Sequence, residues 1–95
     1  MFERFQNVHV KITDFSFLRT IPLEKVDSFL RSRGWQSKPH ENLMIYSDPI
    51  SKRTLELSRN DDFDYAGRLQ AALSEMQDIY KYNELTLVEK ILNAN

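Results

Sequence analysis

The hydrophobic positions of this chain follow a two-residue period at the N-terminus and a helical period further on. Residues 8–12 alternate valine and isoleucine with polar side chains, as in a strand with one buried face. The alternation resumes in residues 14–21, where Phe15 and Phe17 take the same side. This pattern predicts either a β-hairpin or one bent strand.

Apolar side chains recur every three or four residues in the next segment, IPLEKVDSFLRSRG (residues 21–34), while charged side chains take the opposite positions. This pattern predicts an amphipathic helix. Pro22 suits the first turn because its missing N–H needs no partner there. Gly34 suits the left-handed residue that follows a helix end. Trp35 comes next and is expected to fold back over this helix end as a buried core side chain.

Two further strands and two further helices follow in the pattern. LMIY (residues 43–46) and RTLELS (residues 53–58) predict an antiparallel hairpin with a Pro-containing turn. The segment between Gly34 and the first of these strands is expected to be a loop. A polar stretch, RNDDFD, precedes a long helix over residues 63–81. Thr86 and Glu89 have capping-box spacing and predict the start of a short last helix.

Together these elements predict an α+β fold in a single domain, residues 1–95, with a small antiparallel sheet of three to four strands packed on two helices plus a short C-terminal helix. The other face of the sheet is expected to be exposed and lined by Tyr46, Thr54 and Glu56. The predicted core contains one of Val10 and Phe17 together with Val26, Phe29, Leu30, Trp35, Ile45, Leu55, Leu57, Leu69, Leu73 and Met76.

Composition agrees with a small globular protein. The chain has 95 residues, of which 41% are hydrophobic and 28% charged, and it has no cysteine. The absence of cysteine excludes a disulfide framework and a thiolate metal site. The sequence offers no apolar run of about 20 residues that could span a membrane. We therefore expect a cytoplasmic protein that has no membrane contact, metal or cofactor.

Charge is distributed unevenly along the chain. Residues 1–60 carry ten basic and seven acidic side chains, whereas residues 61–95 carry three basic and seven acidic ones. The front part is therefore basic and the back part acidic. This separation points to self-association or to a charged partner.

Four basic residues in or beside the predicted hairpin are the candidates for nucleic-acid binding. They are Lys38, Lys52, Arg53 and Arg59. Side chains of this type contact phosphates when they lie together on one surface. Acidic residues in the same segment favour the alternative of a mixed, solubilising surface.

Features that could support catalysis are few. His40 lies beside Glu41 but has no second histidine nearby, so a loop histidine is the preferred interpretation. The acidic residues between positions 61 and 64 lack the glycine and final glutamate of a calcium loop, and they suit the start of a helix better. A catalytic role requires His40 and this acidic cluster to meet in space. The sequence therefore favours a protein that is not an enzyme.

The last predicted helix is too short to be stable alone. It carries four apolar side chains, which are the candidates for partner binding: Leu87, Val88, Ile91 and Leu92. Residues 85–95 either pack on the domain, begin a further region or bind a partner.

The segment from Phe29 to Ser58 resembles the helix-to-hairpin core of HicA-type toxin domains, small RNA-cleaving proteins with a dsRNA-binding-like fold. The shared features are a helix ending in Gly-aromatic, a strand ending in tyrosine and a turn with proline. Those toxins carry Gly-Ser-His three residues before the strand tyrosine, where this chain has Leu43, and His40 is displaced by three residues. The resemblance implies the fold without the nuclease.

A second resemblance covers more of the chain. Gly34 and Trp35 after the first helix, with Asp64, Tyr65 and Arg68 at the second, are similar to the pattern of a domain near the N-terminus of uncharacterised bacterial proteins. This resemblance implies an architecture and a bacterial or phage source, and no activity.

These observations lead to one main functional hypothesis and two alternatives. The main hypothesis is a non-catalytic module for protein interaction or oligomerisation, which binds through the exposed sheet face or edge and the C-terminal helices. The first alternative is nucleic-acid binding through the basic hairpin. A small hydrolase or nuclease is the third hypothesis.

Overall fold

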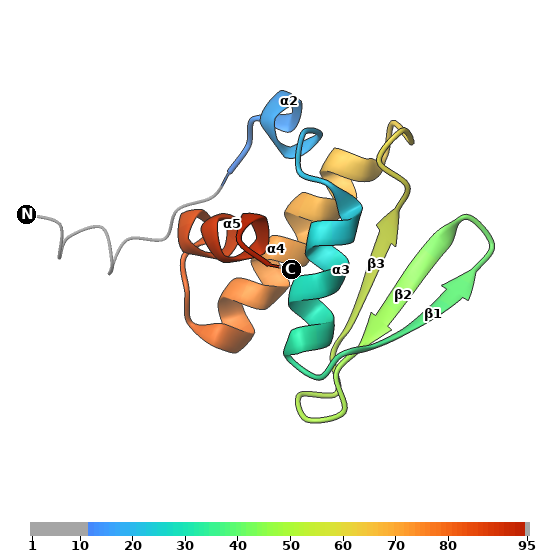
Figure 1. Cartoon of the computed structure of the whole chain (residues 1–95), viewed down its shortest axis with the longest axis vertical. Coiled ribbons are helices and arrows are strands. Elements are labelled where there is room, and N and C mark those ends of the chain that lie inside the picture. The colour runs from blue at the N-terminus through green and yellow to red at the C-terminus, as the bar shows by residue number, and fades with distance from the viewer. Residues whose placement is uncertain (1–11, 95) are drawn as a thin grey trace, which may run out of the picture.

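The structure, a computed structural model, describes residues 12–94. Within them it contains one three-stranded antiparallel sheet and four helices, which confirms the predicted α+β class. In chain order the elements are α2 (Phe15–Leu18), α3 (Leu23–Ser32), β1 (Gln36–His40), β2 (Leu43–Ser47), β3 (Thr54–Ser58), α4 (Tyr65–Tyr80) and α5 (Glu84–Leu92) (Figure 1).

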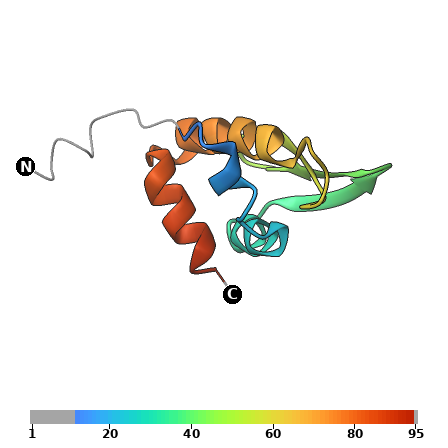
Figure 2. The same ribbon diagram turned by 90° about the horizontal axis from the view of Figure 1, so that it is seen from above.

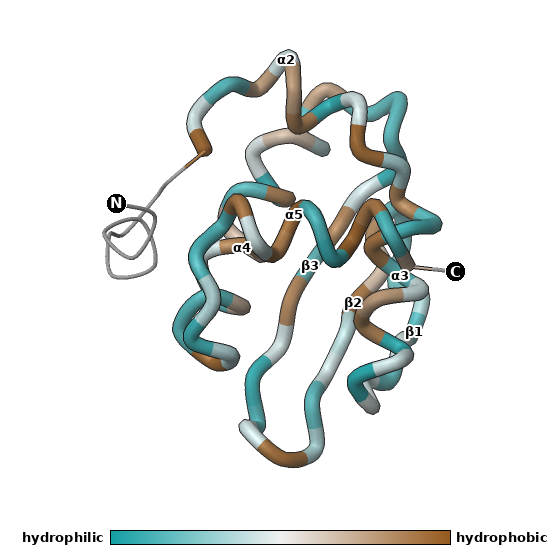
Figure 3. The backbone as a smooth tube through the Cα atoms, turned by 60° about the vertical axis from the view of Figure 1, so that its left-hand side comes forward, coloured by the Kyte–Doolittle hydropathy of each residue, from teal (hydrophilic) through white to brown (hydrophobic). Residues whose placement is uncertain are grey.

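The helices and the sheet form two sides of the molecule. The strand order is β1-β2-β3, with β3 next to α4 and β1 at the opposite edge of the sheet (Figure 1). Helix α4 packs along β3, and α5 packs on both α3 and α4. Figure 2 shows α5 on the side of α3 that faces away from the β1–β2 hairpin. In Figure 3 a separate hydrophobic stretch lies at the tip of the β2–β3 turn, away from the helices.

The strand predicted across residues 14–21 is wrong, because this segment contains the short helix α2. The carboxylate of Asp14 accepts a hydrogen bond from the N–H of Phe17 at 3.1 Å and caps the helix. Local capping chemistry therefore overrides the alternation of aromatic and polar residues in this segment.

The aromatic residues of α2 do not form a core face. Phe15 is 47% exposed and Phe17 is 39% exposed, whereas Leu18 is fully buried. The predicted core position Phe17 is therefore at the surface. Residues 8–11 of the predicted first strand, including Val10, lie outside the described residues.

Helix α3 ends where the sequence predicts, but Pro22 is its N-cap in an extended conformation and not a residue of its first turn. It begins at Leu23, immediately after Pro22, and is followed by Gly34 with φ = 91°. The backbone N–H of Trp35 donates to the carbonyl of Leu30, so the chain turns back on the end of the helix. Trp35 is 3% exposed, which confirms it as a core residue.

The two glycines give a matched test of backbone conformation. We expect Gly34→Ala to lower the free energy of unfolding by about 1 kcal/mol, because alanine is strained at a positive φ although its Cβ would meet nothing within 4 Å. Gly67→Ala, inside α4 and also without close neighbours, is expected to raise it by about 1 kcal/mol. Urea unfolding of the two variants measures this difference. Equal effects would contradict the left-handed conformation of Gly34.

Strand β1 occupies the segment that was expected to be a loop. Residues 36–40 pair antiparallel with β2, with Pro39 opposite Met44. Its sequence, QSKPH, has no apolar alternation because β1 is an edge strand with mostly exposed side chains. Proline is tolerated there because an edge strand pairs on one side only. The strand is therefore recognisable from its pairing and not from its own sequence.

The register of the sheet corrects two predicted positions. Tyr46 lies opposite Leu55, so it shares the buried face, whereas Ile45 lies opposite the exposed residue Glu56. Tyr46 is 1% exposed, and its hydroxyl donates to Asp27 Oδ1 on α3 at 2.7 Å. The predictions of Ile45 in the core and of Tyr46 on the exposed face are both wrong. The buried and exposed positions of β2 alternate as predicted, but they are shifted by one residue.

The remaining predicted core residues are confirmed. Val26, Phe29, Leu30, Trp35, Leu55, Leu57, Leu69, Leu73 and Met76 are all buried. These residues come from α3, β3, α4 and the segment after α3, so one core joins the sheet to the helices.

Helix α5 begins earlier than the capping-box spacing predicts. Asn83 is its N-cap, and the Asn83 side-chain oxygen accepts from the N–H of Thr86 at 2.8 Å. Thr86 lies inside the helix, so the predicted cap is wrong. Glu84, in the first turn, is 1% exposed and accepts from the N–H of Ile12 at 2.7 Å. This hydrogen bond attaches the beginning of the described chain to α5.

Candidate functional site

The four residues predicted to bind nucleic acid are spread over the sheet and are not clustered at one point. Lys52 lies in the β2–β3 turn and Arg59 follows the opposite end of β3. The five strand residues between these ends span about 17 Å. Lys38 lies two strands away on β1, opposite Ile45. The cations are therefore spread along and across the sheet.

Two of these four cations already have acidic partners. Arg53 binds Glu75 and Asp78 on α4, and Asp78 followed by Glu75 raises the pKa of the guanidinium above its usual range. Arg59 pairs with Asp61 at 3.2 Å. The basic front part and the acidic back part of the chain are thus partly neutralised within one molecule.

The apolar residues predicted to bind a partner lie mainly inside the domain. Leu87 and Ile91 are fully buried and Val88 is 5% exposed, whereas Leu92 is 43% exposed. These three buried side chains are not available at the surface, because α5 docks on α3 and α4. The apolar face of α5 is therefore buried within the same chain.

His40 is exposed at the end of β1, opposite Leu43. Strand β2 separates it from β3, which places the two outer strands roughly 10 Å apart. Asp61 pairs with Arg59 instead. In residues 12–94 no group of three or more His, Cys, Asp or Glu side chains is placed to hold a metal ion.

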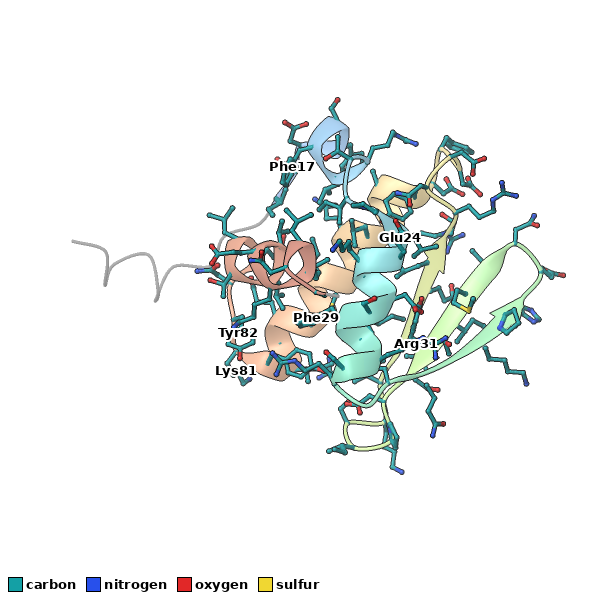
Figure 4. The ribbon with its side chains drawn as sticks, viewed as in Figure 1. Phe17, Glu24, Phe29, Arg31, Lys81 and Tyr82 are labelled. Atoms are coloured by element: carbon teal, nitrogen blue, oxygen red, sulfur yellow. The ribbon has the colours of Figure 1, made fainter. Side chains whose placement is uncertain are left out.

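A hollow of about 390 Å³ lies between the C-terminal halves of α3 and α5. This volume is at the lower end of the range of about 300–1,000 Å³ that ligand pockets occupy. We call it the α3–α5 groove; its lining residues are Phe29, Ser32, Arg33, Glu89, Lys90, Asn93 and Ala94. Figure 4 shows Phe29 on α3 at the side facing α5. Two helix ends about sixty residues apart in the chain therefore line one concave surface.

The cations of the groove are held against aromatic rings. The guanidinium carbon of Arg33 lies 5.1 Å from the ring centre of Phe29, 5.3 Å from that of Tyr80 and 5.9 Å from that of Tyr82. Lys90 Nζ lies 4.9 Å from the ring centre of Tyr82. All four distances are within the range of about 6 Å for cation–π attraction. The two cations are thereby held in place while their charges remain at the surface.

Hydrogen bonding and stacking fix the aromatic rings in turn. Trp35 Nε1 donates to the hydroxyl of Tyr80 at 2.7 Å, and Phe29 meets the Tyr80 ring edge-on with centres 6.2 Å apart. Tyr82 stacks on Tyr80 with centres 6.3 Å apart. Burial raises the pKa of the Tyr80 hydroxyl, and the hydrogen bond from Trp35 opposes this shift. Trp35 therefore fixes the Tyr80 ring that Arg33 contacts.

The charge of the groove is positive. Arg33 and Lys90 face a single acidic lining residue, Glu89. Lys25 lies on the same helix as Arg33, and its Nζ donates to the backbone carbonyl of Ala94 at 2.7 Å. Figure 4 shows Lys81 beside Tyr82 in the α4–α5 connection. The surface suits a ligand that carries carboxylates and an apolar group.

No motif in the sequence predicted this site. Its parts come from the end of α3, the α4–α5 connection and the end of α5, and no short motif contains them. The one local signal is the sequence Tyr80-Lys81-Tyr82, which places two aromatic residues around a lysine at the end of a long helix.

Comparisons with known proteins give no match to a protein-family model, to a curated protein or to a solved structure. The two resemblances drawn from the sequence therefore remain predictions. In the part of the chain that the structure describes, no helix is both long enough and apolar enough to cross a bilayer.

Proposed function

We propose that this domain is a non-catalytic protein-interaction module that binds an acidic, apolar-tipped polypeptide segment in the α3–α5 groove. The observation that carries the proposal is the pair of cations, Arg33 and Lys90, held against aromatic rings at a concave surface. The combination of arginine and tyrosine is typical of the residues that dominate protein–protein binding energy.

The stacked arrangement favours binding for an entropic reason. A long side chain that is mobile before binding loses conformational freedom when a partner orders it. Arg33 is already placed by three aromatic rings and Lys90 by one. A carboxylate that pairs with either cation therefore orders few additional rotamers.

The expected ligand chemistry follows from the lining. Arg33 and Lys90 favour carboxylates, whereas Ala94 offers apolar contact beside them. A segment with acidic residues on both sides of one aromatic or aliphatic side chain satisfies both requirements. A strongly basic segment would be repelled by the same two cations.

Selection from a random peptide library displayed on phage tests this proposal. The wild-type protein is expected to enrich peptides that combine aspartate or glutamate with an aromatic or aliphatic residue. Lys90→Glu is expected to weaken binding of those peptides at least about tenfold, because like charges would then face each other. Lys38→Glu makes the same charge change on β1, away from the groove, and is expected to bind them as the wild type does.

Two results would contradict the proposal. One is a selection in which the wild-type protein enriches no acidic peptide. The other is equal binding of the selected peptides by the wild type and Lys90→Glu. Circular dichroism spectra of both variants verify that they are folded.

The lack of cysteine supports action in the cytoplasm, and the resemblance to bacterial N-terminal domains supports a bacterial or phage source. Nucleic-acid binding remains the alternative prediction. It requires affinity for RNA or DNA that falls steeply with salt. The pairing of Arg53 with both Glu75 and Asp78 favours the interaction module over this alternative.

A further inference from the structure

The loop between β3 and α4 presents an aromatic side chain to solvent. Phe63 is 82% exposed, more than any other phenylalanine among the described residues. Its neighbours Asp61, Asp62 and Asp64 are all acidic. We call residues 61–64 the Phe63 loop. An apolar tip flanked by carboxylates is the ligand chemistry that the α3–α5 groove requires.

The Phe63 loop is held in position by backbone contacts. The Arg19 guanidinium donates to the carbonyl of Asp62 at 3.0 Å and to the carbonyl of Phe63 at 2.8 Å. Asp62 Oδ1 accepts from the N–H of Asp64 at 3.1 Å. These bonds fix the backbone around Phe63 and leave its ring outside the core. The loop therefore has little conformational freedom to lose on docking.

The carboxylates around Phe63 can exchange partners readily. Asp61 pairs with Arg59, but the two side chains are 73% and 77% exposed. Asp64 lies 4.0 Å from Arg68, at the limit of an ion pair. Exposed ion pairs contribute little to stability, so replacing them with pairs to a second molecule has a small cost.

We propose that the Phe63 loop of one copy of this chain docks in the α3–α5 groove of a second copy, with its carboxylates facing Arg33 and Lys90. This inference rests on the proposed function of the groove and names its occupant. Charge complementarity between the acidic loop and the cationic groove supports it. The exposed Phe63 ring supplies apolar contact to Ala94, since the other apolar lining residue, Phe29, is buried in the core and covered by Arg33.

The loop cannot fill the groove of its own molecule. Asn60, just before the loop, accepts from the N–H of Leu23 at 2.6 Å and so places the loop at the N-terminal end of α3. The groove lies at the C-terminal end of the same helix, around Arg33. Ten helical steps separate Leu23 from Arg33, about 15 Å. Two copies with antiparallel α3 helices could exchange both contacts and form a closed two-fold dimer.

The test measures the mass of the full chain by sedimentation and light scattering, at protein concentrations from about 10 µM to about 1 mM, the range of weak association. We expect a dimer at the upper end that dissociates as salt is raised. Phe63→Ser and Lys90→Glu are each expected to weaken this association at least about tenfold. Ile50→Ser and Lys38→Glu are the matched controls, since Ile50 is 89% exposed in another turn, and both should associate like the wild type.

A mixing experiment identifies the contact itself. Phe63→Ser retains the groove and Lys90→Glu retains the loop, so a mixture of the two can form one loop–groove contact that neither can form alone. Energy transfer between differently labelled variants is expected only in this mixture. Recovery of association on mixing would be specific to the proposed pairing.

A monomer at every concentration would overturn the second-copy proposal, as would a dimer that Phe63→Ser leaves unchanged. Peptide selection separates this failure from failure of the proposed function. If acidic peptides still bind in a Lys90-dependent way while the chain stays monomeric, the groove is an interaction site for another protein. If neither peptides nor a second copy bind, both proposals are wrong.

Discussion

Leu87→Ala is expected to lower the free energy of unfolding by about 3 kcal/mol, because it leaves a cavity where a fully buried side chain packs α5 on the domain. A domain of this size has a total stability of about 5–15 kcal/mol, so the loss is a large fraction of it. Urea unfolding followed by circular dichroism and by the fluorescence of the buried Trp35 measures the change.

Leu85→Ala is the matched control for this prediction. Leu85 lies in the same helix and is 57% exposed, so the same substitution is expected to change the stability by less than about 1 kcal/mol. If both variants lose equally little, α5 is not docked in solution. In that case Leu87, Val88 and Ile91 would again be available for a partner.

Above pH 10 the free energy of unfolding is expected to fall, because buried tyrosine hydroxyls resist ionisation. Burial raises the pKa of Tyr65 from 10.0 to about 12. Below pH 10 the hydroxyl is protonated in both states and its contribution to stability is complete. Between the two pKa values the unfolded chain ionises first, and stability falls by about 1.4 kcal/mol for each pH unit.

Tyr65→Phe is expected to reverse its rank against the wild type as the pH rises. At neutral pH the variant lacks the hydrogen bond to the carbonyl of Ile21 and is about 1 kcal/mol less stable. That carbonyl keeps a second donor, Asn60 Nδ2 at 2.9 Å, so it is not left unpaired. Near pH 11 the variant should become the more stable protein, because it has no hydroxyl to ionise.

Unfolding in urea at pH 7 and at pH 11 measures this crossing. Burial and the hydrogen bond to Asp27 also raise the pKa of Tyr46, so part of the alkaline decline should remain in the variant. Parallel stability curves for the wild type and Tyr65→Phe would contradict a raised pKa of Tyr65.

Local sequence signals predicted most of the elements and failed where two signals competed. The ends of α3 follow from Pro22 and Gly34, whose backbone preferences act within a few residues. In α2 the alternation of Phe15 and Phe17 predicted a strand, but the Asp14 cap makes a helical turn. At α5 two side chains had capping chemistry, and Asn83 caps the helix instead of Thr86.

The candidate site was not predictable in the same way. The predicted basic residues are separated by the length of the sheet, and the predicted apolar residues of α5 are buried. The groove depends instead on Arg33 and Lys90, which are fifty-seven positions apart. Their relation to Tyr80 and Tyr82 arises only when α5 packs across α3.

The sequence by itself determined the α+β class, the termini of α3, the β2–β3 hairpin and the long helix α4, because periodicity and proline or glycine preferences act over a few residues. Tertiary structure decided that β1 is a strand, that Tyr46 rather than Ile45 faces the core, and that α5 docks. It also created the α3–α5 groove. Each of these depends on distances between segments far apart in the chain, where pairing and packing outweigh local preference.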